Sequence, residues 1–250
     1  MTRESAVRVG LVYPELLGTY GDRGNAIVLV QRLARRGIEA ELVEVPAGAS
    51  IPADLDVFLF GGGEDNPQGA AADGMRASST NIARARDNGA VVFAVCAGFQ
   101  LIGTRYETSD GEHLDGLGLV DAVTVGGADR LIGEVVVEPE PPLPLLTGFE
   151  NHSGRTTLGP GTRPLGRVLT GGGNGDGGDG VLGERVVGTY LHGPVLPRNP
   201  ALADFLLAQV VGPLPALASS LEDQLRAERL DVALAGRFGR WREKRHLARG

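Results

Sequence analysis

The pattern of apolar and polar residues in the first hundred positions alternates between a helical period and a strand period. Residues 26–37 carry apolar side chains at helical spacing and end at Gly37, and a second helix is predicted over about 75–88. Four short runs that are continuously or alternately apolar predict strands, over residues 7–13, 38–45, 54–60 and 91–95. Strands that alternate with helices predict an α/β fold, with an open, mostly parallel sheet flanked by helices.

From about residue 119 onward the sequence changes to strand-like segments that proline and glycine interrupt. We expect them to add antiparallel strands within the same domain, at residues 120–125, 133–138, 162–170 and 184–193. The proline-rich residues 139–146 fit neither a helix nor a strand. Residues 171–180, GGGNGDGGDG, are expected to be a long loop and the most flexible stretch, because a single imperfect glycine repeat does not predict a calcium site.

Two helices are predicted at the C-terminal end, over residues 201–212 and 216–241. Apolar residues follow one side of the second helix and predict docking on the core: Leu217, Leu221, Leu225, Leu230, Leu234 and Phe238. The basic residues from 237 to 249 are interpreted as a solvated tail rather than a contact for a partner or a membrane. We therefore divide the chain into a main domain, residues 1–215, and a helical extension with a basic tail, residues 216–250.

Composition narrows the classes of function. The chain has 250 residues, of which 42% are hydrophobic, enough for a sizeable core, and its net charge of -7 makes nucleic acid an unexpected partner. A single cysteine excludes an intramolecular disulfide and a thiolate zinc site, and no metal is expected. No transmembrane run or signal sequence is recognised, so we expect a cytoplasmic protein. Because Lys244 is the only lysine, no GxxxxGK[ST] phosphate loop and no nucleotide cofactor are expected in this chain.

The single cysteine, Cys96, stands between the predicted strand 91–95 and a predicted helix that begins at Ala97. Such a sharp turn from strand to helix lifts a side chain above the carboxyl edge of the sheet, where open α/β folds bind ligands. The helix N-terminus also stabilises a thiolate. Position alone leaves two interpretations open, a nucleophile or a buried structural cysteine.

A thiolate that attacks an amide or an ester needs hydrogen-bond donors for the oxyanion and an acid–base group. The backbone N–H of Ala97 comes with the turn. The glycines after the third predicted strand offer a second donor, Gly63 first and Gly62 second, unless they form only a strand-ending turn. His192 ends an apolar strand pattern at a Gly-Pro turn, which favours it as the base, and His152 is the second candidate.

The cysteine turn, the glycine loop and the histidine at a strand end occur together in one known family of enzymes. The stretches GGGED (61–65), VCAGFQLIG (95–103) and TYLHGP (189–194) resemble the class I glutamine amidotransferases, in the branch that includes cobyric acid synthase. The resemblance implies a flavodoxin-like sheet and hydrolysis of glutamine through a cysteine thioester, with release of glutamate and ammonia.

Three further stretches narrow the resemblance. TYGDRGN (19–25), ADRLIGE (128–134) and GFENHSGRT (148–156) are similar to the GatD family, the glutamine amidotransferase subunits of lipid II isoglutaminyl synthase. This resemblance implies a heterodimer with a MurT-type Mur ligase subunit. That partner uses ATP and the released ammonia to amidate the α-carboxyl of D-glutamate in lipid II, a step of peptidoglycan synthesis.

By this resemblance Cys96 matches the family's nucleophile, His192 its histidine, and Arg130 the arginine that holds the α-carboxylate of glutamine. The N–H groups of Gly63 and Ala97 are then the expected oxyanion donors. Arginine suits its role because its planar fork can hold a carboxylate with two hydrogen bonds. Without the resemblance, Arg130 would be interpreted as a surface charge.

The chain departs from many class I enzymes, which place an acid two residues after the histidine, because Gly193 and Pro194 follow His192. Three acids elsewhere in the chain are candidates for that role: Asp22, Asp65 and Glu150. The resemblance implies instead an aspartate from the partner subunit, so we expect the chain alone to be a weak glutaminase. Two rival interpretations are an amidotransferase for another acceptor, such as a corrinoid, and a non-catalytic scaffold with the same fold.

Overall fold

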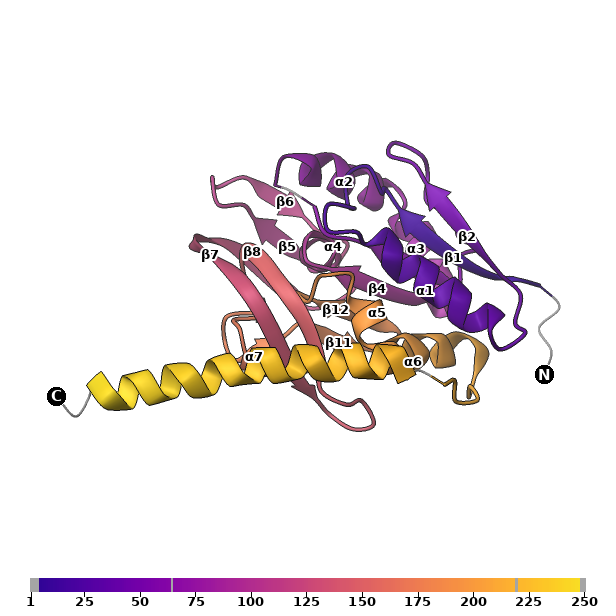
Figure 1. The fold of residues 1–250 in the computed structure, drawn as a ribbon. Helices are drawn as coiled ribbons and strands as arrows, with labels where there is room; N and C mark the ends of the chain where they lie inside the picture. Colours follow the sequence, from indigo (N-terminus) through magenta and orange to yellow (C-terminus); the bar gives the residue numbers. More distant parts are fainter. Residues whose placement is uncertain (1–4, 64, 219, 248–250) are drawn as a thin grey trace.

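The computed structural model describes residues 5–63, 65–218 and 220–247, with side chains over 5–63, 68–218 and 221–235 (Figure 1). One sheet has six strands in the order β11-β12-β4-β3-β1-β2. Its pairs are parallel except at the β11 edge. The strands are β1 (Val7–Val12), β2 (Ala40–Val45), β3 (Val57–Phe60), β4 (Val91–Val95), β11 (Val181–Gly183) and β12 (Val186–Thr189).

Helices pack against this sheet in two groups. In the first group, α1 (Arg23–Ala34) contacts β1 and β2 and packs with α5 (Val195–Arg198) and α6 (Pro200–Val211). The second group contains α2 (Asp65–Ala77), α3 (Ser79–Asp87) and α4 (Ala97–Ile102). The prediction of one helix over about 75–88 is therefore wrong, since two helices occupy this region. Ser78 separates them, and its hydroxyl oxygen accepts a hydrogen bond from the backbone N–H of Ile51 at 3.0 Å.

The second half of the chain builds a second sheet, in the order β10-β9-β7-β5-β6 with β8 paired to β7. Two predicted strands, 120–125 and 133–138, are one long strand with irregular pairing between Gly126 and Leu131. Its long partner β8 is not among the predicted strands. The elements are β5 (Arg105–Glu107), β6 (His113–Asp115), β7 (Ala122–Pro139), β8 (Leu146–Leu158), β9 (Gly166–Thr170) and β10 (Gly178–Asp179).

The prediction of a long loop over the glycine-rich residues 171–180 is wrong at its end, where the short strand β10 lies, and hydrogen bonds fix the residues before it. The N–H groups of Gly172 and Gly173 donate to the carboxylate of Glu150 at 2.8 and 3.0 Å. The buried side chain of Asn174 exchanges two further hydrogen bonds with the backbone of the same loop. The glycines therefore let the backbone pack closely around the side chains of Glu150 and Asn174, so their conformational freedom serves close packing rather than flexibility.

The last helix, α7 (Ser220–Leu247), runs past β7 and β8 and extends beyond the rest of the molecule (Figure 1). Its predicted docking on the core is wrong at the start, where Leu221 is 78% and Leu225 43% exposed. Leu230 and Leu234 are half-buried, and the side chain of Phe238 and the basic tail lie outside the described side chains. Within the described chain, no helix combines the length and apolar composition that crossing a membrane requires.

Candidate active site

Cys96 forms the predicted turn between β4 and α4. Its backbone has φ 49° and ψ -104°, a conformation that costs a non-glycine residue roughly 1–3 kcal/mol. Neighbouring backbone holds it there: the Cys96 N–H donates to the carbonyl of Thr189 at 2.9 Å, and the Gly98 N–H to that of Gly61 at 3.0 Å. Such strain, fixed by its surroundings, is typical of a nucleophile turn.

His192 leaves the sheet at the same edge. β12 runs parallel to β4, with Thr189 opposite Val95, so Cys96 and His192 both follow the carboxyl ends of adjacent strands. Two backbone hydrogen bonds with Phe149 of β8, at 3.1 and 2.7 Å, fix the His192 backbone. The structure thus brings the predicted cysteine and histidine to one edge of the sheet.

The glycine loop after β3 lies against the imidazole. A Cβ placed on Gly62 would stand 2.5 Å from Cε1 and 3.2 Å from Nδ1 of His192. The Gly62 N–H donates to Oδ2 of Asp22 at 2.7 Å, so it is already occupied. The N–H groups of Gly63 and Ala97 make no hydrogen bond with another residue in the described part of the chain. The geometry therefore favours Gly63 over Gly62 as an oxyanion donor.

No acid is hydrogen-bonded to His192 among the side chains that the structure describes. Asp22 accepts two hydrogen bonds, and burial raises its pKa to about 6. The Glu150 carboxylate is held by the glycine-rich loop and lies 3.4 Å from Nε2 of His152. The side chain of Asp65 lies outside the described residues. Asp22 and Glu150 are therefore committed to other partners.

The imidazole of His192 is fully buried, and neither of its ring nitrogens has a hydrogen-bond partner among the described residues. Burial lowers its pKa to about 3, and electrostatic interactions with His152 and Arg130 act in the same direction. The ring of Tyr20 packs against it, with the ring centroids 4.4 Å apart. His192 is therefore neutral around pH 7 and able to accept a proton, but a pKa this low makes it a weak base.

His152, the second candidate, is already engaged with other groups. Its ring stacks on Tyr190 with centroids 3.7 Å apart, and its Nδ1 lies 3.0 Å from the carbonyl oxygen of Gly154. Burial raises the pKa of Tyr190, which follows Thr189, the residue whose carbonyl accepts the hydrogen bond from the Cys96 N–H. The geometry thus favours His192, the less constrained imidazole.

Arg130 reaches the same edge from the irregular part of β7. Its Nε donates to Oδ1 of Asn151 at 2.6 Å, and its Nη2 to the Asn151 carbonyl at 3.5 Å. The Asn151 Nδ2 donates in turn to the hydroxyl of Tyr20 at 2.7 Å. Sequence reasoning missed Tyr20 and Asn151 as individual residues. The available signal was their place in TYGDRGN and GFENHSGRT, which carried the resemblance.

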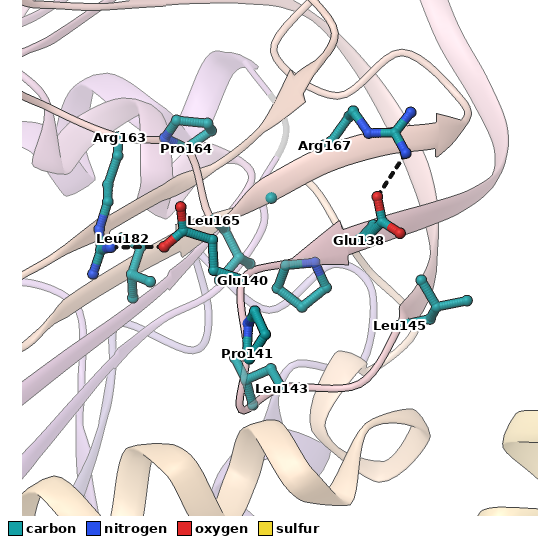
Figure 2. A pocket seen from close by; sticks show the side chains of 12 residues that line it. Glu138, Glu140, Pro141, Leu143, Leu145, Arg163, Pro164, Leu165, Arg167 and Leu182 are labelled. Atoms are coloured by element: carbon teal, nitrogen blue, oxygen red, sulfur yellow. Dashed lines mark hydrogen bonds and ion pairs between the residues drawn. The ribbon is translucent and has the colours of Figure 1, made fainter.

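A separate pocket of about 660 Å³ lies where β7 ends and β9 begins (Figure 2). Two ion pairs lie in it, Arg163 with Glu140 at 3.0 Å and Arg167 with Glu138 at 2.6 Å. None of the predicted site residues lines this pocket, so it is not the candidate active site.

Comparison with known proteins agrees with this geometry. Residues 8–200 match the CobB/CobQ-like glutamine amidotransferase domain. The chain is 39% identical over 194 residues to the lipid II isoglutaminyl synthase (glutamine-hydrolyzing) subunit GatD of Staphylococcus aureus (strain N315), covering 76% of this chain and 79% of that protein. It is 34% identical over 237 residues to the subunit of the same name from Streptococcus pneumoniae (strain ATCC BAA-255 / R6), covering 90% and 91%.

More distant matches agree as well. The cobyric acid synthase of Sphingopyxis alaskensis is 31% identical over 68% of this chain, but over only 35% of its own length. A solved structure described as a glutamine amidotransferase superposes with a TM-score of 0.55 at 21% identity, covering 81% of this chain and 99% of that one. This likeness confirms the predicted fold class, and the family match confirms the resemblance. The chain therefore belongs to the family of CobB/CobQ-like glutamine amidotransferase domains.

Proposed function

We propose that this chain is the glutaminase subunit of a lipid II isoglutaminyl synthase, which hydrolyses L-glutamine and supplies ammonia to a MurT-type ligase. The observation that carries the proposal is the strained Cys96 at the start of α4, beside His192 at the end of the adjacent strand. The chain matches 79% and 91% of the two GatD subunits but 35% of the cobyric acid synthase, which favours lipid II over a corrinoid as the acceptor.

In the proposed reaction, His192 takes the thiol proton while Cys96 Sγ attacks the side-chain amide carbon of glutamine. The N–H groups of Gly63 and Ala97 hold the oxyanion, and one such donor contributes roughly 2.7–4 kcal/mol in studied enzymes. His192 returns the proton to the leaving ammonia and then activates the water that hydrolyses the thioester. The products are glutamate and ammonia.

Arg130 is the proposed anchor for the α-carboxylate of glutamine. Its guanidinium is exposed at the active-site edge and close enough for its charge to lower the pKa of His192. A planar fork with several N–H donors is suited to a carboxylate. Arg130 thus fixes the end of the substrate that does not react.

A carboxylate from the partner subunit is the proposed third member of the catalytic group. Both nitrogens of His192 lack a partner among the described residues, and Gly193 and Pro194 stand where many class I enzymes have an acid. A nearby carboxylate would raise the pKa of His192 and fix its ring, so the chain alone should be weakly active. ATP and lipid II bind to the partner in this scheme, and the reaction takes place in the cytoplasm, where a thiol stays reduced.

The test is ammonia release from glutamine by wild type and by Cys96→Ala, each alone and with the MurT-type partner. We expect cysteine-dependent release that rises sharply with the partner, and no effect of Arg167→Ala in the remote pocket. No release from wild type with a partner shown to bind would favour the scaffold. Release with a partner that amidates a corrinoid instead of lipid II would contradict the proposed acceptor.

A further inference from the structure

Asn151 and Tyr20 connect Arg130 with His192 in a bridge of two hydrogen bonds and one ring contact. The amide of Asn151 accepts a hydrogen bond from Nε of Arg130 at 2.6 Å and donates one to the hydroxyl of Tyr20 at 2.7 Å. The Tyr20 ring then lies on the imidazole of His192, at 4.4 Å between centroids and a tilt of 51°. These four side chains come from the loop after β1, from β7, from β8 and from the end of β12.

We propose that Asn151 is a positioning residue for the substrate. Asn151 orients the guanidinium of Arg130 toward the α-carboxylate of glutamine. Through Tyr20, it also couples the orientation of Arg130 to the position of the His192 ring. This inference rests on the proposed glutaminase function, and it assigns a role to a residue outside the reacting groups.

The need for such a residue follows from the exposure of Arg130. A long exposed side chain samples many rotamers, and ordering it on binding costs conformational entropy. The Nε bond and the contact of Nη2 with the Asn151 carbonyl select one orientation before the substrate arrives. The two hydrogen bonds leave Nη1 of Arg130 without a hydrogen-bond partner among the described residues, so the N–H groups on Nη1 can donate to an anion.

The chemistry of position 151 allows a sharp distinction between a positioning role and a merely structural one. An aspartate has the same shape as asparagine and can accept hydrogen bonds from both Arg130 and Tyr20. It would preserve the bridge but neutralise the charge of Arg130 and repel the substrate carboxylate. If Asn151 holds Arg130 against the substrate carboxylate, Asn151→Asp should therefore raise KM more than Asn151→Ala, whereas a bridge that serves only the fold predicts that the aspartate variant is the milder one.

The experiment measures KM and kcat for glutamine hydrolysis in the complex with the partner. We expect Asn151→Ala to raise KM about tenfold, the effect of losing one charge-assisted hydrogen bond, with a smaller change in kcat. Asn151→Asp should raise KM further. Tyr20→Phe, which keeps the ring but loses the hydroxyl, should raise KM less than either. The matched control is Asn88→Ala, at an exposed position after α3, which should leave KM unchanged.

A second measurement confirms that the variants are folded. A diazoketone analogue of L-glutamine needs the carboxylate grip to alkylate Cys96, whereas iodoacetamide does not. Asn151→Ala should slow inactivation by the analogue about tenfold and leave the iodoacetamide rate unchanged. An unchanged KM, or an aspartate variant milder than alanine, in an active complex would overturn the inference and leave the glutaminase proposal standing. A wild-type complex that releases no ammonia would overturn both.

Discussion

Replacing Gly62 with alanine should lower the turnover of the glutaminase reaction sharply. The new Cβ would stand 2.5 Å from Cε1 of His192, whereas carbon atoms in contact lie roughly 3.5–4.0 Å apart. The methyl group and the imidazole must therefore separate by about 1 Å. The loop backbone resists this movement, because the Gly62 N–H is held by Asp22 at 2.7 Å and the Gly62 carbonyl accepts a hydrogen bond from the Thr19 N–H at 3.2 Å.

The imidazole of His192 moves instead, since no hydrogen bond to its ring nitrogens opposes the shift among the described residues. A misplacement of about 1 Å costs roughly 100-fold in rate, which corresponds to about 2.7 kcal/mol of activation free energy. Overpacking of this kind also lowers the unfolding free energy by roughly 1–3 kcal/mol. Gly62→Ala should thus remain folded at room temperature while its kcat falls by about two orders of magnitude.

The assay is steady-state ammonia release by the complex, with urea denaturation of the same samples. The matched control is Gly69→Ala within α2, where an added Cβ meets nothing within 4 Å. This control should keep the wild-type kcat and gain roughly 0.5–1 kcal/mol of stability, because alanine favours a helix interior. A Gly62→Ala enzyme with the wild-type kcat would refute the contact between the glycine loop and the imidazole.

Three further predictions concern charge. Burial raises the pKa of Asp179 to about 7, so the folded chain keeps a proton that the unfolded chain loses near pH 4. The unfolding free energy should therefore fall between about pH 4 and pH 7. In urea denaturation, Asp179→Asn should make this decrease smaller. An equal slope in the variant would contradict this. Asp204 accepts hydrogen bonds at 2.7 Å from the nearly buried guanidinium groups of Arg32 and Arg36. Asp204→Ala should therefore lower the unfolding free energy by roughly 3 kcal/mol in the same assay. A loss under about 1 kcal/mol would contradict the stabilising role of these ion pairs. Because the pKa of His192 is lowered to about 3, kcat/KM of the chain alone should show no step from this residue between about pH 5 and 8 in a pH–rate profile. The partner carboxylate that we propose should introduce such a step in the complex.

The nucleophile turn was predictable because its determinants are local. The strand over residues 91–95 and the helix start at Ala97 agree with the structure residue for residue. A continuous apolar run, one cysteine and the small residues after it are sufficient to place such a turn. The sequence ranked Gly63 ahead of Gly62 as an oxyanion donor, but the physical reason for that order is not local. It depends on Asp22, which lies forty positions earlier in the chain and reaches Gly62 only in the folded state.

Two of the errors have a common physical cause, because one sequence pattern serves two structural purposes. Glycines in residues 171–180 predict a loose loop, but here they allow the backbone to close around the buried carboxylate of Glu150. Leucines at helical spacing predict docking on the core, but Leu221 and Leu225 on α7 are exposed. Periodicity identifies the apolar side of a helix and does not identify what covers it.

The electrostatics of His192 connect substrate binding with the partner subunit. An acid that protonates the leaving amide nitrogen must carry a proton, yet burial and electrostatic interactions with His152 and Arg130 lower the pKa of His192 to about 3. A glutamine carboxylate bound to Arg130 would offset the charge of Arg130, and a partner carboxylate facing the ring would stabilise the imidazolium directly. We infer that each step raises the pKa of His192 toward its ordinary value. Glutamine would then be hydrolysed efficiently only when both the substrate and the ligase that uses the ammonia are in place.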